Sequence, residues 1–242
     1  MINIDAAKTI MHPLCRRWGS GDDKLREVII KNGYAYACDG HILLRCTVGT
    51  ADGRTYDSNY NDYPKEYPVG SFNGLLHGRK VKKWMALPTD SIDWHNFVAE
   101  LTKEVERKKI IADQEHVSRY TIEECPCCGE TVYYDKEECK LVEQVDIKMP
   151  EDIDYRDALL PVEVGIDGEY ILVNFAYLWA AYMVLGKFEV GKDEFGCLAI
   201  RKGDARGCIL PLNKESCPAD CMPNVLDCEQ TLDKPEAVGG AK

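Results

Sequence analysis

The sequence has no long hydrophobic run, and this absence excludes a membrane-spanning helix. A helix needs roughly 18 or more consecutive apolar residues to cross a bilayer, and no segment approaches that length. A secretory signal peptide is not expected either, because Asp5 and Lys8 fall where such a signal would be apolar. We therefore expect a cytoplasmic protein.

Positive charge is the scarcer sign, with 30 Lys and Arg against 41 Asp and Glu and a formal net charge of -11. This balance argues against a generally basic nucleic-acid-binding protein, although an acidic protein can still concentrate positive charge on one face. The sequence also lacks a glycine-rich phosphate loop, a dinucleotide fingerprint and a paired-histidine metal motif. It therefore offers no motif for nucleotide-dependent or histidine-metal catalysis.

What is present suits a globular protein with reduced thiols. At 242 residues and 45% hydrophobic, the chain can bury the core of one large or two small domains. Twelve cysteines without an export signal indicate free thiols, a subset of which is available to bind metal.

A short pattern of strands and tight turns occurs twice in the chain. Residues 26–46 contain three apolar runs separated by Asn32-Gly33 and Asp39-Gly40, which are turn pairs typical of hairpins. Residues 187–212 repeat the pattern. Each copy follows a candidate helix, the second of which is capped by Asn174 and closed by Gly186. We expect an α+β fold made of repeats of a helix plus a three-stranded antiparallel meander.

The first helix is expected to be amphipathic. Ile4, Ala7, Met11 and Leu14 recur at helical spacing, and Lys8 and Arg16 lie on another face. Pro13 should kink this helix or cut it short.

These repeats resemble a known family. The segment Tyr36-Ala-Cys-Asp-Gly-His-Ile-Leu43 is similar to the A-T-D-G-H-R-L segment of bacterial DNA polymerase sliding clamps. Phe175-x-Tyr177-Leu178 and the strands that end at residues 209–212 are similar to the last helix and final strands of the same clamps. The resemblance covers about 100 of the 242 residues and skips the middle of the chain.

The resemblance implies a non-enzymatic protein that forms a dimeric or trimeric ring on duplex DNA and tethers a DNA polymerase or other replication proteins. Two clamp-like domains would suit the length of the chain. The alternative is a single clamp-like domain, split into halves by residues 49–160, in a chain that does not close a ring. The expected organisation is a first repeat at 1–50, a middle region at 51–160, a last repeat at 161–213 and a flexible tail at 214–242.

Basic residues on three segments are the candidates for contact with duplex DNA, because Lys and Arg contact phosphates without reading the base sequence. A solvated basic surface explains the same pattern equally well. The candidates are Lys8, Arg16, Arg17, Arg79, Lys80, Lys82, Lys83, Arg107 and Lys108.

A zinc site is expected in the middle region. The turn Cys125-Pro-Cys-Cys128-Gly between two strand-like runs resembles a zinc-ribbon knuckle, in which two thiolates bind one Zn²⁺. Cys139 is the expected third ligand. The fourth would come from one of Cys127, His116, Cys217, Cys221 and Cys228. A hairpin that persists without metal is the alternative, and zinc is not part of the clamp pattern. If zinc is bound, the runner-up function is a zinc-ribbon adaptor that binds protein or nucleic acid.

Cys38, Asp39 and His41 are the best local candidates for a catalytic site. However, Cys38 is an alternating strand residue like its neighbours, and turn chemistry fully explains Asp39-Gly40. We therefore do not expect an enzyme.

Overall fold

The computed structural model describes residues 11–15, 28–49, 69–124, 131–137, 140–142, 153–217 and 223–230. It contains both helices and antiparallel sheets, as expected for an α+β fold. The chain divides into two compact units, the first made of Met1–Ile92 with Pro161–Lys242 and the second of Asp93–Leu160. Within the described ranges, no helix is long and apolar enough to span a membrane.

The first predicted meander is confirmed. Its strands are β1 (Ile29–Lys31), β2 (Tyr34–Cys38) and β3 (Ile42–Thr47). Asn32 and Gly33 have φ values of 53° and 77°, the left-handed conformation that a tight hairpin turn requires. Asp39 shapes the second turn, because its Oδ1 accepts hydrogen bonds from the backbone N–H groups of His41 and Ile42 at 2.8 and 2.9 Å.

Only part of the expected first helix is described. A 3₁₀ turn, η1 (His12–Leu14), contains Pro13, which cannot donate the backbone hydrogen bond of a continuing helix. Met11 and Leu14 are fully buried against the first meander. Residues 1–10 lie outside the described part of the chain.

The second half of the first unit contains a strand hairpin, a helix and the second meander. These elements are β8 (Pro161–Ile166), β9 (Glu169–Asn174), α4 (Phe175–Leu185), β10 (Glu189–Lys192), β11 (Leu198–Lys202) and β12 (Ala205–Ile209). The predicted helix ends are confirmed, because the Asn174 side chain accepts from the Ala176 N–H and Gly186 closes the helix with φ 66°.

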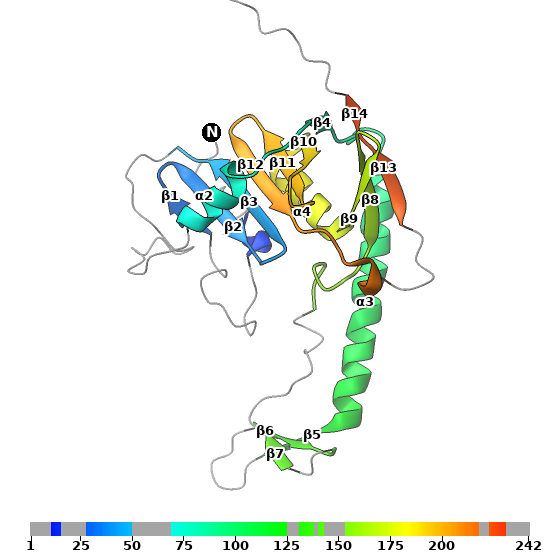
Figure 1. Ribbon diagram of the computed structural model, residues 1–242. Coiled ribbons are helices and arrows are strands. Elements are labelled where there is room, and N and C mark those ends of the chain that lie inside the picture. Colours follow the sequence, from blue (N-terminus) through cyan, green and yellow to red (C-terminus); the bar gives the residue numbers. More distant parts are fainter. Residues whose placement is uncertain are drawn as a thin grey trace, which may run out of the picture. The chain divides into compact units, whose positions relative to one another are not determined.

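The two meanders are joined edge to edge. Strand β3 pairs antiparallel with β12, from Ile42 opposite Ile209 to Arg45 opposite Arg206. The result is one sheet in the order β1-β2-β3-β12-β11-β10-β4-β14 (Figure 1). Two short strands complete it, β4 (Met85–Ala86) and β14 (Glu229–Gln230). Both repeats therefore belong to one compact unit, and the second unit is inserted between them.

Side chains alternate between the two faces of this sheet. On one face, Leu44, Ile200 and Ile209 are completely buried. On the other, helix α2 (Val69–His77) places Phe72 against Tyr36, in a core cluster with Ile29 and Leu43. Arg45 lies on the same face as Tyr36 and Leu43, because Tyr36 is its partner on β2 and Leu43 is two residues before it on β3.

Short elements lie within residues 214–242, the segment expected to be a flexible tail. Lys214–Ser216 form a 3₁₀ turn, η4, and Asn224–Asp227 form β13, which pairs parallel with β8. Strand β14 then pairs with β4. These strands were not predictable from the sequence, because they are held by backbone pairing and show no pattern of buried apolar residues. In β13, for example, Val225 is exposed and Leu226 is buried.

The second unit contains a long helix and a small sheet. Helix α3 (Trp94–Arg119) begins after Asp93, whose side chain caps it by accepting from the Asn96 N–H at 3.0 Å. The expected hairpin follows as β5 (Tyr120–Glu124) and β6 (Thr131–Asp135), and β7 (Lys140–Val142) pairs with β6.

Candidate functional site

The basic segment Arg79–Lys83 lies against strand β10 of the large sheet. Val81 forms a bridge with Asp193, next to β10. A Cβ atom at Gly191 would lie 2.3 Å from Val81 Cγ1 and 2.6 Å from the Lys83 carbonyl oxygen, closer than atoms can approach. Glycine at position 191 therefore allows the segment to pack on the strand.

This segment borders a cavity of about 460 Å³ near the β8–β9 and β10–β11 turns. Its charged lining consists of four lysines and four carboxylates. They are Lys80, Lys82, Lys83, Lys192, Asp167, Glu169, Asp193 and Glu194. The densest positive segment of the sequence is therefore balanced by acidic side chains from elsewhere in the chain.

Two of these lysines form ion pairs, Lys83 with Asp167 and Lys192 with Glu169. The hydrogen bond from Lys192 lowers the pKa of Glu169. All four side chains are substantially exposed, so each pair contributes little to stability. A DNA phosphate at this cavity would compete with carboxylates, and exposed Lys80 and Lys82 are the more accessible candidates.

Arg79 lies deeper than the neighbouring lysines. Its Nη1 is 2.8 Å from Oδ2 of Asp193, whose side chain is only 1% exposed. Burial by itself lowers the pKa of Arg79, but hydrogen bonds to Asp193 and Cys197 outweigh it and leave that pKa raised. One of the nine candidate DNA contacts is thus held in a buried ion pair.

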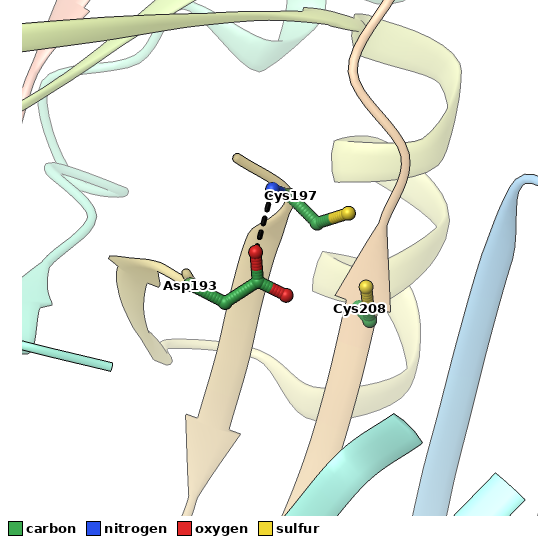
Figure 2. A group of neighbouring side chains, drawn as sticks. All are labelled: Asp193, Cys197 and Cys208. Carbon is green, nitrogen blue, oxygen red and sulfur yellow. Dashed lines mark hydrogen bonds between the residues drawn. The ribbon is translucent and has the colours of Figure 1, made fainter. Parts of the chain in front are cut away.

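Asp193, Cys197 and Cys208 lie together, as Figure 2 shows, and each of them contacts this guanidinium. Their ligand atoms lie within 4.8 Å of one another, and two thiols with a carboxylate are donors that Zn²⁺ accepts. However, Arg79 Nη1 lies 3.1 Å from Cys197 Sγ and 3.8 Å from Cys208 Sγ, in the position a metal would take.

The thiol chemistry agrees with this arrangement. Burial raises the pKa of Cys208 to about 12, so this thiol is protonated near neutral pH. Asp193 Oδ1 accepts the Phe195 and Cys197 backbone N–H groups, and Oδ2 accepts from Arg79. Asp193 therefore holds the Arg79 guanidinium against the turn formed by residues 193–197. The turn was predictable from the sequence, but its contacts with Arg79 and Cys208 were not, because those residues lie far from it along the chain.

The remaining candidate DNA contacts are distributed between the second unit and undescribed segments. In the second unit, Arg107 forms an ion pair with Glu104 at 2.7 Å on the same helix. This hydrogen bond raises the pKa of Arg107. Lys8, Arg16 and Arg17 lie outside the described residues.

The proposed zinc ligands Cys125, Cys128 and Cys139 lie outside the described residues, as do Cys127 and Cys221. The hairpin around the first two is described up to Glu124, which pairs with Thr131. The other end of β6, where Asp135 pairs with Lys140, lies about 13 Å further along the strand. Of the fourth-ligand candidates, His116 is buried against Tyr120 and Tyr133.

The candidate catalytic residues take part in turn and packing contacts. The Asp39 carboxylate accepts two backbone hydrogen bonds, as described above. The His41 ring stacks on Tyr177 of α4 with centroids 5.8 Å apart, and Cys38 Sγ accepts a weak hydrogen bond from the Gly40 N–H. His41 therefore links the turn of the first repeat to the helix of the second.

No protein-family model matches the sequence, and no curated protein matches it. Solved structures of bacterial sliding clamps do match. The Helicobacter pylori beta clamp bound to a DNA ligase peptide is 10% identical with a TM-score of 0.43, over 86% of this chain and 62% of that chain. The DNA polymerase III beta chain of Streptococcus pneumoniae is 12% identical with a TM-score of 0.41, over 84% and 61%. The DNA polymerase sliding clamp of Bacillus subtilis is 13% identical with a TM-score of 0.37, over 84% and 60%. The chain thus spans about three fifths of the length of these clamps.

Proposed function

We propose that the protein is a non-enzymatic, clamp-like replication factor that associates with duplex DNA and tethers replication proteins. The observation that supports this best is the β3–β12 pair, which joins two meanders into one sheet. The segments that resemble the clamps are Tyr36–Leu43, which spans the β2–β3 turn, and Phe175–Leu178, which begins helix α4. They meet where the rings of His41 and Tyr177 stack on each other.

In this proposal the first unit is one clamp-like domain, and residues 93–160 are an insertion within it. The second repeat supplies no basic helix, because α4 contains no Lys or Arg and most of its residues are buried. The positive charge that faces DNA therefore comes from Lys8, Arg16 and Arg17 of the first repeat, with Lys80 and Lys82 as additional contacts. Such phosphate contacts hold a duplex weakly and without sequence preference, which allows sliding.

A ring requires several copies of the chain. Within the described residues, the large sheet ends at β1 on one side and at β14 on the other. Pairing of such edges between copies would continue the sheet across a subunit interface. We propose that this single-domain chain nevertheless forms a homo-oligomer, either a dimeric or a trimeric ring, in which these edges lie at or near the contacts.

Retention on DNA tests the proposal directly. The full chain is loaded on closed circular and on linearised DNA, and the bound fraction is measured after gel filtration. We expect retention on the circle, loss from the linear form, and weaker retention for Lys8→Glu/Arg16→Glu. A control with the same charge change, Lys103→Glu/Lys214→Glu, alters exposed lysines outside the proposed surface and should behave like the wild type.

Equal retention of both double variants would contradict the assigned DNA-facing surface. Equal loss of the wild type from circular and linear DNA would contradict encirclement. Native mass spectrometry of the same sample reports the number of subunits, and a monomer at the loading concentration would exclude a closed ring.

A further inference from the structure

Three arginines form a row across three neighbouring strands of the large sheet. Arg45 on β3 lies opposite Arg206 on β12, and Arg206 lies opposite Arg201 on β11. The row continues to Glu189 on β10, whose carboxylate accepts from Arg201 Nε at 2.6 Å. Like charges directly opposite each other destabilise a sheet. The presence of three arginines in one row therefore calls for an explanation.

Arg45 is the most buried member, with 5% of its surface exposed. Its Nη2 donates to the Asp204 carbonyl oxygen at 3.0 Å, its Nη1 contacts His77 Nε2, and its guanidinium lies 4.2 Å from the centre of the Tyr34 ring. None of these partners is a carboxylate. Among the described residues, Nε has no hydrogen-bond partner. A buried guanidinium without an anion is costly.

The neighbouring groups respond to this surplus of positive charge. Burial lowers the pKa of Arg206, and Arg45 and Arg201 lower it further, against smaller opposing effects of Asp204 and Glu189. Burial likewise lowers the pKa of His77, and Arg45 and Arg206 add to the effect. The row therefore creates a local positive potential that its own carboxylates do not cancel.

A cavity of about 200 Å³ opens beside the row, between α2 and the sheet. Its charged lining consists of Arg206, His77, Arg79 and Asp193. The last two neutralise each other in their ion pair, so Arg206 supplies the unbalanced charge of the lining, and Arg45 lies next to it on β3 outside the lining. Nη1 of Arg206 donates to the Gly203 and Ala205 carbonyl oxygens, and neither of these partners carries a charge. Trp84 forms another wall, and Arg201 lies 4.6 Å from the centre of the Trp84 ring.

We propose that this cavity binds a phosphate group, as inorganic phosphate or as a terminal phosphate monoester. The planar guanidinium of arginine offers parallel donors that match phosphate oxygens, and the cavity has room for a tetrahedral anion. The lysine-lined cavity near Arg79–Lys83 differs, because its four lysines already have four carboxylates beside them. The proposal does not depend on whether the protein encircles DNA.

The test measures thermal unfolding of the full chain in increasing inorganic phosphate, with chloride at equal ionic strength as the reference. We expect saturable stabilisation by phosphate alone. Arg206→Gln should weaken binding by about tenfold or more, whereas Lys214→Gln, which removes one exposed positive charge in the same unit, should leave it unchanged.

Two further arms identify the source of the phosphate. A 5′-phosphorylated oligonucleotide that binds more tightly than its 5′-hydroxyl counterpart would assign a terminal phosphate of nucleic acid. Binding of inorganic phosphate with no such difference would assign the free ion. If Arg206→Gln failed to fold, Arg206→Lys would replace it and should also bind more weakly, because an ammonium lacks the paired donors.

Equal stabilisation by phosphate and chloride would overturn the proposal. Unchanged phosphate affinity in a folded Arg206 variant would overturn it as well.

Discussion

Arg206 lies directly opposite Arg45 where the two halves of the large sheet meet, and neither guanidinium hydrogen-bonds to a carboxylate among the described residues. The junction is held by the apolar pairs beside them, such as Ile42 with Ile209. The two halves of the sheet therefore pair despite the repulsion between these two arginines.

Relief of this repulsion should stabilise the ligand-free protein. We expect Arg206→Gln to raise the free energy of unfolding by about 0.5 kcal/mol, the typical size of a cross-strand charge effect. Urea denaturation at low ionic strength is the measurement, and added salt should shrink the gain. Lys214→Gln is the matched control and should change little. A destabilised Arg206→Gln would show that its bonds to the Gly203 and Ala205 carbonyls outweigh the repulsion.

Asp193 should be among the most sensitive positions in the first unit. Asp193→Ala leaves the Phe195 and Cys197 N–H groups without their acceptor and strands the Arg79 guanidinium. We expect a loss of about 3 kcal/mol in the free energy of unfolding, measured by urea denaturation. Glu194→Ala, on an exposed neighbour in the same turn, should cost less than about 0.5 kcal/mol. Similar losses for both would argue against the buried ion pair.

Two glycines should respond to alanine with opposite signs. Gly191→Ala places a methyl group against Val81 and the Lys83 carbonyl, and we expect it to cost about 1–3 kcal/mol. Gly74 lies in α2 with no atom near the position of a Cβ, so Gly74→Ala should stabilise by about 0.5–1 kcal/mol through helix propensity. Thermal melts of the two variants check the signs. A neutral Gly191→Ala would mean that the Arg79–Lys83 segment does not pack on β10.

His77 should make stability fall as the pH is lowered. Its folded pKa lies below the ordinary value of 6.5, so below that pH the unfolded state binds more protons. This contribution is complete above the unfolded pKa and is lost as the pH falls towards the folded one. Urea denaturation between about pH 7 and about pH 5 should therefore show a smaller loss for His77→Gln than for the wild type. Identical losses would contradict a His77 pKa lowered by burial and by the neighbouring arginines.

The zinc prediction is tested by metal content. If Cys125 and Cys128 bind Zn²⁺, native mass spectrometry should show one metal ion per chain that Cys125→Ser/Cys128→Ser abolishes. Cys38→Ser, at a turn of the large sheet, is the control and should keep the metal. Ring assembly and DNA retention should be unaffected, because the hairpin belongs to the inserted unit. Unchanged metal content in the double variant would exclude this site.

Local chemistry made much of the fold predictable. Asn32-Gly33 specifies its turn because both residues accept positive φ, and Asn174 with Gly186 marks the two ends of α4. Strands β4 and β14 escaped prediction because two residues carry no periodic pattern. The β3–β12 pair was equally hidden, since no local signal reports a partner strand so distant in the sequence.

The candidate site shows the same limit. A cluster of basic residues at positions 79–83 is visible in the sequence, but the carboxylates that balance it, such as Asp167 and Glu169, come from distant turns. Arg45, Arg201 and Arg206 are inconspicuous one by one, and only the strand register places them in a row. Charge density along a sequence is therefore a poor guide to charge density on this fold.

The pairing of β3 with β12 also fixes an order of events during synthesis. The first meander can form as soon as it leaves the ribosome, but its partner strand follows roughly 160 residues later, a delay of about 8–30 s at usual elongation rates. Throughout that interval the outer edge of β3 is open to pairing with other nascent chains. A charged side chain on an open edge discourages such pairing, so we expect Arg45 to protect the unfinished sheet until β12 has been made.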